Sequence, residues 1–255
     1  MQGLVEVREL HVRYGACEAV RGVSFSLGKG EILGIVGESG SGKSTIARTL
    51  MGLEKPSQGE IRFAFPVPRS AMRPMQMVFQ DAVGSLNPRM TVRQTLKEIV
   101  AFAGRQRGEA SDGRDIGRLL DLVGLSPAVL DQYPREMSGG QCQRVSIARA
   151  LACKPQVLVA DEPVSALDVS VQARILNLLR DLRRELGLSI LLIAHDLAVV
   201  KNVCDRICVM EKGLFVDSGE AAEVFERPQS DYTKRLLEAV PRILRLPLRS
   251  DDNML

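Results

Sequence analysis

The sequence predicts an α/β fold with a helical insert, and three observations lead to this prediction. Short apolar segments typical of buried strands occur at residues 32–36, 75–79, 157–160 and 190–194. Segments with helical spacing alternate with them, at residues 42–51, 138–153 and 171–185. From about residue 85 to residue 130, helical spacing replaces the strand pattern, which indicates an insert in the α/β core.

The chain before the insert predicts two further strands. Residues 5–12 alternate apolar and polar side chains, which is the pattern of a half-buried strand. Residues 20–27 predict a second strand. After the helix at 42–51, the segment Lys-Pro-Ser-Gln-Gly at 55–59 is a turn signal.

In the insert and beyond it, each helix has a recognisable spacing or boundary. Residues 91–102 and 116–123 carry helical spacing on either side of a polar stretch. The helix at 138–153 opens with Ser-Gly-Gly and ends before Lys-Pro. The helix at 171–185 is stopped by Gly187. The remaining elements are a hairpin at 207–216, short helices at 221–225 and 233–239, and a frayed end at 250–255.

Composition indicates a globular chain rather than a membrane span. The 255 residues suffice for one large domain or two small ones, and 45% are hydrophobic and 25% charged. A net charge of +3 is too small to argue for nucleic acid as the main partner. No run approaches 18 consecutive apolar residues, and the N-terminus lacks the apolar core of a signal peptide. If the protein works at a membrane, other chains must provide the membrane part.

The cysteines predict no disulfide framework or zinc site. There are five, an odd number, and they are scattered. Cys204 and Cys208 lie four residues apart and could share a helix face. We interpret them as buried small hydrophobic residues in a reducing compartment.

The segment after the strand at 32–36 matches the P-loop pattern, Gly-Glu-Ser-Gly-Ser-Gly-Lys-Ser. Its glycines let backbone N–H groups surround phosphate oxygens, and the following helix directs its positive end at the same anion. We expect Lys43 to reach the β and γ phosphates and the Ser44 hydroxyl to bind Mg²⁺. The residues expected to bind the nucleotide here are Gly37, Glu38, Ser39, Gly40, Ser41, Gly42, Lys43, Ser44 and Thr45.

A second apolar strand, at 157–160, ends in two acids. We expect it to be a parallel strand beside the P-loop strand, because that position delivers both carboxylates to the phosphate end of the sheet. Asp161 would then hold Mg²⁺, directly or through water, and Glu162 would act as general base toward the attacking water. The alternative is an ordinary strand end with exposed acids.

The segment Ser-Gly-Gly-Gln at 138–141 resembles the signature motif of ATP-binding cassette (ABC) proteins, with Met137 in place of the usual leucine. Alone, it would be only a capped helix start. Further motifs stand in the family's order along the chain. Those that resemble the family's adenine-stacking aromatic, Q-loop, D-loop and switch residue are Tyr14, Gln80, residues 165–168 and His195.

This resemblance covers about residues 4–242 and implies a P-loop NTPase cassette with a RecA-like core, an antiparallel β subdomain and a helical insert at about 85–145. We therefore expect a nucleotide-binding domain at 1–242 and a C-terminal tail at 243–255. The resemblance implies ATP and Mg²⁺ as cofactors. It implies that Gln80 is a further metal ligand, and that Gln80 and His195 are both catalytic residues. Two cassettes close head to tail in this family. The signature residues implied to bind the partner's ATP are Ser138, Gly139, Gly140 and Gln141.

Several stretches resemble the ATPases of oligopeptide, dipeptide and nickel importers. These are residues 75–81, 85–89 and the terminal segment 223–241, which contains Asp-Tyr-Thr-Lys-Arg-Leu-Leu. The segment at 63–73 is short, and the longer cysteine-containing tail of many peptide-importer ATPases is missing. Peptides and nickel or metal chelates both remain open as the solute.

An importer ATPase of this kind would be peripheral, at the cytoplasmic face of the inner membrane. The implied partners are two transmembrane permease subunits, a second ATP-binding subunit and, indirectly, an extracytoplasmic solute-binding protein. The ATPase pair is a homodimer or a heterodimer, and the resemblance favours a heterodimer. One alternative is an exporter ATPase. The other is a soluble ABC ATPase that acts on nucleic acid or ribosomes. In that soluble class, DNA-repair members need long coiled coils or zinc inserts, and translation-type members usually carry two cassettes in one chain. Co-purification with permeases rather than ribosomes or DNA would separate these classes.

Overall fold

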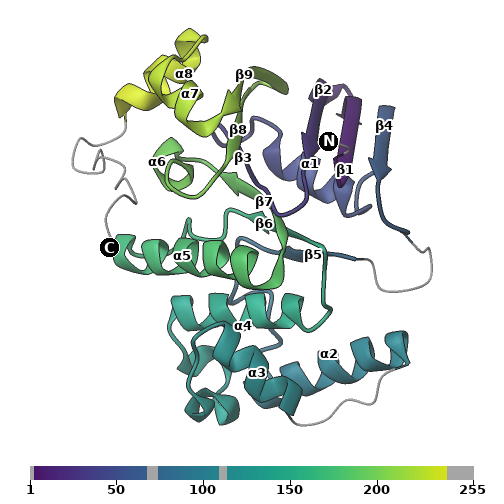
Figure 1. The fold of residues 1–255 in the computed structure, drawn as a ribbon, viewed down its shortest axis with the longest axis vertical. Helices are drawn as coiled ribbons and strands as arrows, with labels where there is room; N and C mark the ends of the chain where they lie inside the picture. The colour runs from purple at the N-terminus through teal and green to yellow at the C-terminus, as the bar shows by residue number, and fades with distance from the viewer. Residues whose placement is uncertain (1–2, 68–73, 109–113, 240–255) are drawn as a thin grey trace, which may run out of the picture.

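A computed structural model describes residues 3–67, 74–108 and 114–239 of the protein. The predicted tail at 243–255 and the last residues of the importer-like segment lie outside this range. Two sheets and their flanking helices make up the fold (Figure 1). Where the sequence predicted a strand or a helix within the described residues, the structure has that element.

The larger sheet lies at the centre of the molecule. Its strand order is β5-β6-β7-β3-β8-β9, and all neighbours are parallel except the hairpin of β8 and β9. Its strands are β3 (Ile32–Val36), β5 (Met75–Val78), β6 (Val157–Asp161), β7 (Ser189–Ala194), β8 (Arg206–Glu211) and β9 (Leu214–Glu220).

The smaller sheet is antiparallel, in the order β2-β1-β4. Its strands are β1 (Val5–Tyr14), β2 (Cys17–Leu27) and β4 (Gln58–Phe63). The helices are α1 (Lys43–Leu50), α2 (Val92–Arg107), α3 (Arg114–Leu122), α4 (Gly139–Leu151), α5 (Val169–Leu186), α6 (Leu197–Val200), α7 (Ala221–Glu226) and α8 (Asp231–Ala239), with 3₁₀ turns η1 (Pro127–Asp131) and η2 (Pro134–Glu136).

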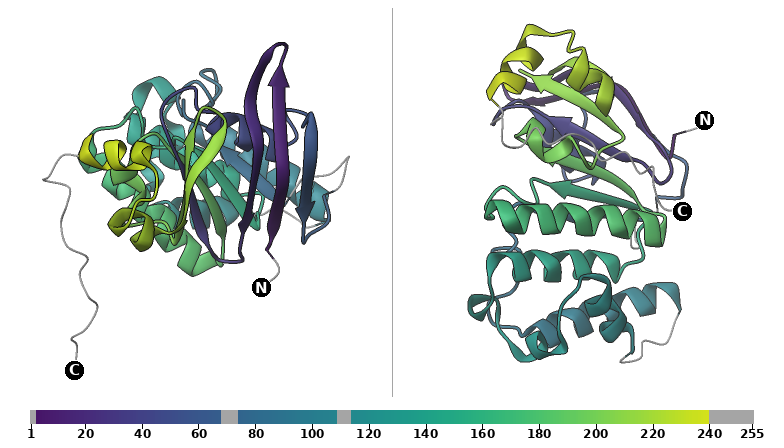
Figure 2. Two further views of the ribbon diagram at one scale, coloured as in Figure 1. Left: turned by 90° about the horizontal axis from the view of Figure 1, so that it is seen from above. Right: turned by 60° about the vertical axis from the view of Figure 1, so that its left-hand side comes forward.

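The two faces of the larger sheet bury different elements, because successive side chains of a strand point to opposite faces. From β3, Leu33 and Ile35 pack with Ile46 of α1 and with the antiparallel sheet. Ile32 and Val36 point the other way, into a core shared with α4 and α5. Helices α1 and α4 therefore lie on opposite faces of the sheet, as Figure 1 and the right-hand view of Figure 2 show.

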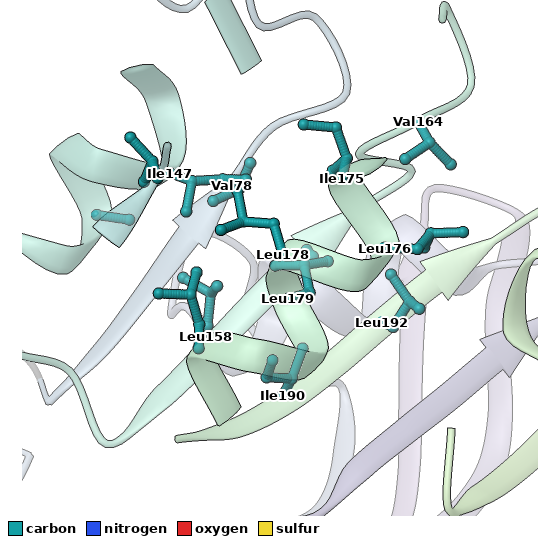
Figure 3. Close-up of a cluster of buried hydrophobic side chains, with 14 of the residues drawn as sticks. Val78, Ile147, Leu158, Val164, Ile175, Leu176, Leu178, Leu179, Ile190 and Leu192 are labelled. Carbon is teal, nitrogen blue, oxygen red and sulfur yellow. The ribbon is translucent and has the colours of Figure 1, made fainter. Parts of the chain in front are cut away.

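Helix α5 covers the second face with a stripe of aliphatic side chains. Ile175 and Leu179 are fully buried. Figure 3 shows them beside Leu158 of β6 and Ile190 and Leu192 of β7, with Val78 and Ile147 in the same cluster. Gly187 caps the end of the helix, as predicted, and its φ of 65° lies in the left-handed region that favours glycine. Helices α2 and α3 pack beyond α4 and form the insert region (Figure 2).

One predicted neighbour relation is wrong. Strand β6 does not lie beside the P-loop strand β3, because β7 lies between them and pairs with both. The reason is the short crossover through α5, which returns the chain next to the strand that it has just left. Strand β4 was not predicted, and Cys204 and Cys208 share no helix, since Cys208 lies in β8.

Candidate nucleotide-binding site

The P-loop joins β3 to α1 and lies tightly against β8. A Cβ atom added to Gly37 would lie 2.0 Å from the Met210 carbonyl oxygen. Gly42 caps α1 with a φ of 110°, a conformation that favours glycine. The loop can follow this path only because glycine stands at positions 37 and 42.

Lys43 extends back into the P-loop. Its Nζ atom donates hydrogen bonds to the carbonyl oxygens of Gly37 and Glu38, both at 2.7 Å, and to Ser41 Oγ at 3.4 Å. The side chain is 3% exposed. Burial lowers the pKa of Lys43, while the carboxylates of Glu162 and Asp161 oppose this shift. The loop thus holds a desolvated cation at its centre, where an anionic group would be attracted.

Ser44 of α1, the helix that follows β3, contacts Asp161 at the end of β6, although β7 lies between these two strands. Ser44 Oγ donates to Asp161 Oδ1 at 2.9 Å. Burial raises the pKa of Asp161, and the Ser44 hydrogen bond opposes this shift. A hydroxyl and a carboxylate are hard oxygen ligands that suit Mg²⁺, which is normally completed by water and substrate phosphates. The described residues contain no group of three or more His, Cys, Asp or Glu side chains placed for a metal. A metal held here would therefore need such outside ligands.

Glu162 lies at the centre of three strand ends. Its Oε2 atom accepts a hydrogen bond from Gln80 Nε2 at 3.0 Å and is 3.9 Å from His195 Nδ1. Its Oε1 atom is 4.0 Å from Lys43 Nζ. Gln80 follows β5, Glu162 follows β6 and His195 follows β7. The parallel strands thus deliver all three side chains to one edge of the sheet.

The backbone at Glu162 is in the left-handed region, with a φ of 45°. Its N–H donates to the Ile193 carbonyl oxygen at 3.0 Å, and its own carbonyl accepts from Ser165 Oγ at 3.1 Å. Such a conformation is costly for a residue with a side chain and is concentrated at functional sites. Hydrogen bonds on both sides keep it in place and fix the direction of the carboxylate.

The signature residues form a capped helix start on the other side of the larger sheet from α1. Ser138 caps α4: its Oγ accepts from the Gln141 N–H at 3.3 Å, and Gln141 Oε1 accepts from the Ser138 N–H at 2.9 Å. Ser138 and Gly139 are exposed, while Gly140 packs closely, since an added Cβ would lie 2.6 Å from Val171 Cγ1. Helix α4 and helix α1 pack on opposite faces of the sheet. The structure therefore does not add these residues to the cluster around Lys43.

The remaining predicted residues lie around the loop. Tyr14 is the last residue of β1 and is 42% exposed, so its ring is available for stacking. Ser39 and Gly40 are exposed at the tip of the P-loop, and Thr45 is buried in α1. Sequence reasoning missed one contact: the hydroxyl of Tyr232 in α8 accepts a hydrogen bond from the Glu38 N–H at 3.0 Å. These residues are 194 positions apart, and no local pattern could have indicated the pair.

Comparison with known proteins agrees with this geometry. The family model described as ABC transporter matches residues 20–165. The chain is 45% identical over 232 residues to the oligopeptide transport ATP-binding protein OppF of Haemophilus influenzae, covering 88% of this chain and 70% of that protein. It is 46% identical over 242 residues to the oligopeptide transport ATP-binding protein AppF of Bacillus subtilis, covering 90% of this chain and 72% of that one.

Solved structures agree as well. CbiO1 of Clostridium perfringens, described as part of the ABC transporter complex cbiONQ, has a TM-score of 0.77 and 29% identity over 96% of this chain and 98% of its own. The ATP-binding cassette MJ0796, solved as a dimer with ADP and Pi, has a TM-score of 0.73 and 27% identity over 85% and 98%. None of the described helices is long and apolar enough to cross a membrane. The predicted fold class and ATPase class are thereby confirmed, and the chain belongs to the ABC transporter family as an ATP-binding subunit.

Proposed function

We propose that the protein hydrolyses ATP to power a peptide importer. The observation that carries the proposal is the convergence of Lys43, the Ser44–Asp161 pair and Glu162 at one edge of the sheet. The similarity to oligopeptide transport ATP-binding proteins favours peptides as the solute, with nickel or metal chelates as the second candidate. It also favours an importer over an exporter or a soluble ABC ATPase.

Lys43 and the backbone N–H groups of the P-loop bind the β and γ phosphates, and Tyr14 stacks on adenine. Ser44, Asp161 and Gln80 are the residues that would hold Mg²⁺, which offsets phosphate charge when bound. Glu162 accepts the proton of the water whose oxygen attacks the γ phosphorus, while the bond to ADP breaks. His195 and Gln80 orient Glu162 and the water, because both already lie beside Glu162 Oε2.

Replacing Glu162 tests this chemistry. Glu162→Gln keeps the shape of the side chain but removes the base, so ATP should still bind while turnover falls by about two to four orders of magnitude. Lys43→Ala is the companion variant and should weaken ATP binding itself, because it removes a charge-assisted contact. Measurement of phosphate release and a nucleotide titration separate the two effects. Phosphate release by Glu162→Gln close to the unaltered rate would reject the assignment.

The partners that we propose are two permeases and a second ATP-binding subunit, with the solute-binding protein acting through the permeases. We place the complex at the cytoplasmic face of the inner membrane. The proposed nucleotide-binding domain is 1–242, with the insert at about 85–145 and a tail at 243–255.

Arg89 is exposed between β5 and α2, close in sequence to Gln80, and should lie at the permease. A cysteine crosslinker at Arg89 should capture a permease, and one at exposed Glu185 should not. The reverse pattern would contradict the proposal.

Uptake distinguishes the solutes. Vesicles that contain this chain with its permeases and second ATPase should accumulate labelled oligopeptide in the presence of ATP and the solute-binding protein. Uptake of labelled nickel without peptide uptake would favour the second candidate. A complex that carries Glu162→Gln provides the control for uptake that is independent of hydrolysis.

A further inference from the structure

The peptide group between Gly37 and Glu38, at the start of the P-loop, is held at both of its polar atoms. Its carbonyl oxygen, that of Gly37, accepts from Lys43 Nζ at 2.7 Å. Its N–H, that of Glu38, donates to the hydroxyl of Tyr232 at 3.0 Å. Because a peptide group is planar, a bond that fixes the N–H also fixes the direction of the carbonyl. Lys43 and Tyr232 therefore act on one rigid unit.

The segment that carries Tyr232 is itself anchored to the larger sheet. Asp217 of β9 accepts hydrogen bonds from the N–H groups of Gln229 at 2.8 Å and Ser230 at 3.3 Å. Ser230 Oγ then accepts from the Tyr232 N–H at 3.1 Å, which fixes the first turn of α8. Tyr232 is 6% exposed and Thr233 is fully buried. The hydroxyl thus reaches the P-loop from a fixed position rather than from a free surface side chain.

The Tyr232 hydroxyl remains neutral in this position. Burial raises the pKa of Tyr232, and the bond from the Glu38 backbone opposes this shift. A neutral phenol accepts the N–H through its oxygen. It adds no charge near Lys43, so its effect on the loop is one of orientation rather than of electrostatic attraction or repulsion.

We propose that Tyr232 is a positioning residue for nucleotide binding, because it orients the Gly37–Glu38 peptide whose carbonyl holds the Lys43 ammonium inside the P-loop. This inference rests on the proposed function. When phosphates draw Lys43 away from that carbonyl, the Tyr232 bond remains and keeps the start of the loop in its binding shape. Helix α8 thereby sets nucleotide affinity from a distant part of the chain.

Tyr232→Phe removes only the hydroxyl and tests the proposal. The dissociation constant for ATP should rise about threefold to tenfold, which is the range expected for one neutral hydrogen bond. The measurement is a titration of the full chain with a fluorescent ATP analogue. Tyr133→Phe is the matched control, since it removes one hydroxyl from the half-buried tyrosine that precedes η2. It should leave the dissociation constant for ATP unchanged.

Hydrogen exchange at the Glu38 amide provides a second readout that does not depend on ATP. This amide should exchange faster in Tyr232→Phe, while the amide of Leu50 at the end of α1 keeps its rate. An unchanged dissociation constant in a folded Tyr232→Phe protein would overturn the proposal, as would an equal loss in Tyr133→Phe. Failure of Tyr232→Phe to fold would assign the hydroxyl to stability and would also overturn it. If the unaltered chain does not bind ATP, the proposed function fails instead.

Discussion

Gly37 illustrates how a single residue fixes the shape of the P-loop. The space beside its Cα is filled by the backbone of β8, since an added Cβ would lie 2.0 Å from the Met210 carbonyl oxygen. Strand pairing places that oxygen, because Val36 and Val209 are partners in the parallel ladder. The loop cannot move away without breaking this pairing.

We therefore expect Gly37→Ala to destabilise the protein by about 1–3 kcal/mol, as overpacking usually does. Urea unfolding measures the change. Gly117→Ala is the opposite control, because Gly117 lies in α3 with nothing within 4 Å of its added Cβ. Alanine favours a helix, so this control should gain up to about 1 kcal/mol. Equal stability of Gly37→Ala and the unaltered chain would contradict the structure of the loop.

The buried carboxylate of Asp161 lowers the stability of the folded protein at neutral pH, although the proposed function needs it. Because its pKa is raised by burial, the folded state keeps the proton to a higher pH than the unfolded chain does. The stability that Asp161 contributes therefore falls as pH rises from the unfolded pKa through the raised folded pKa. At neutral pH the ionised carboxylate is unfavourable in its buried position.

Asp161→Asn should unfold at the same temperature as the unaltered chain or a higher one, without nucleotide at pH 7. Its amide oxygen can still accept the hydrogen bond from Ser44 Oγ, and the buried charge is gone. Magnesium-dependent phosphate release should fall in the same variant. Thermal unfolding at pH 7 and at pH 5 checks the first part, and a lower unfolding temperature at pH 7 would contradict it.

At the scale of elements, α5 contributes most clearly through its buried stripe. Leu179 is fully buried against β6 and β7, whereas Leu186 on the same helix is 37% exposed. Leu179→Ala should cost about 2–5 kcal/mol, because the rigid surroundings leave a cavity. Leu186→Ala should cost much less. Chemical denaturation of the two variants measures the difference, and similar losses would be inconsistent with the packing in Figure 3.

Elements with a strong local pattern could be predicted from the sequence, and those without one could not. The strand at 32–36 is uniformly apolar and was placed with its correct bounds. Strand β4, Gln-Gly-Glu-Ile-Arg-Phe, has no fully buried residue, although Ile61 and Phe63 pack against the core. Its first two residues belong to the predicted turn signal at 55–59, and the segment has no strong apolar pattern. The Ser138 cap was predictable because Ser and Gln stand three residues apart in a capping box.

Relations between distant elements were harder to predict. The wrong placement of β6 beside β3 arose because apolar runs carry no information on strand order. The structure nevertheless brings Gln80, Glu162 and His195 together, because each follows a strand of the larger sheet and parallel strands end at one edge. The Tyr232–Glu38 bond lies outside this rule, since Tyr232 comes from a helix.

At the scale of the whole molecule, the family resemblance predicts a nucleotide site that is shared between two chains, and the position of α4 is compatible with it. Ser138 caps α4, which packs on the opposite side of the larger sheet from α1, the helix that follows the P-loop. MJ0796 is a dimer in its solved structure with ADP and Pi. We expect Ser138→Arg to bind ATP as a monomer but to lose dimerisation and hydrolysis, because a bulky side chain replaces the partner's γ phosphate.

Mixing Ser138→Arg with Lys43→Ala tests this sharing, provided that the chain homodimerises. One composite site of the mixed dimer then has both required residues, and the other carries both changes. Partial recovery of phosphate release on mixing is the expected result. Full activity of Ser138→Arg alone would exclude the signature role, and mixed dimers without activity would argue against independent shared sites.

The strand order also has a consequence for synthesis on the ribosome. Strand β3 emerges early, but its only described ladder partners are β7 and β8, which are made more than a hundred residues later. Until then, the five residues of β3, which are all buried in the finished protein, have unpaired strand edges. Such segments promote aggregation while they wait for their partners. Nascent chains that are stopped before residue 189 should therefore associate with a chaperone that shields apolar strands, and chains extended past residue 220 should be released.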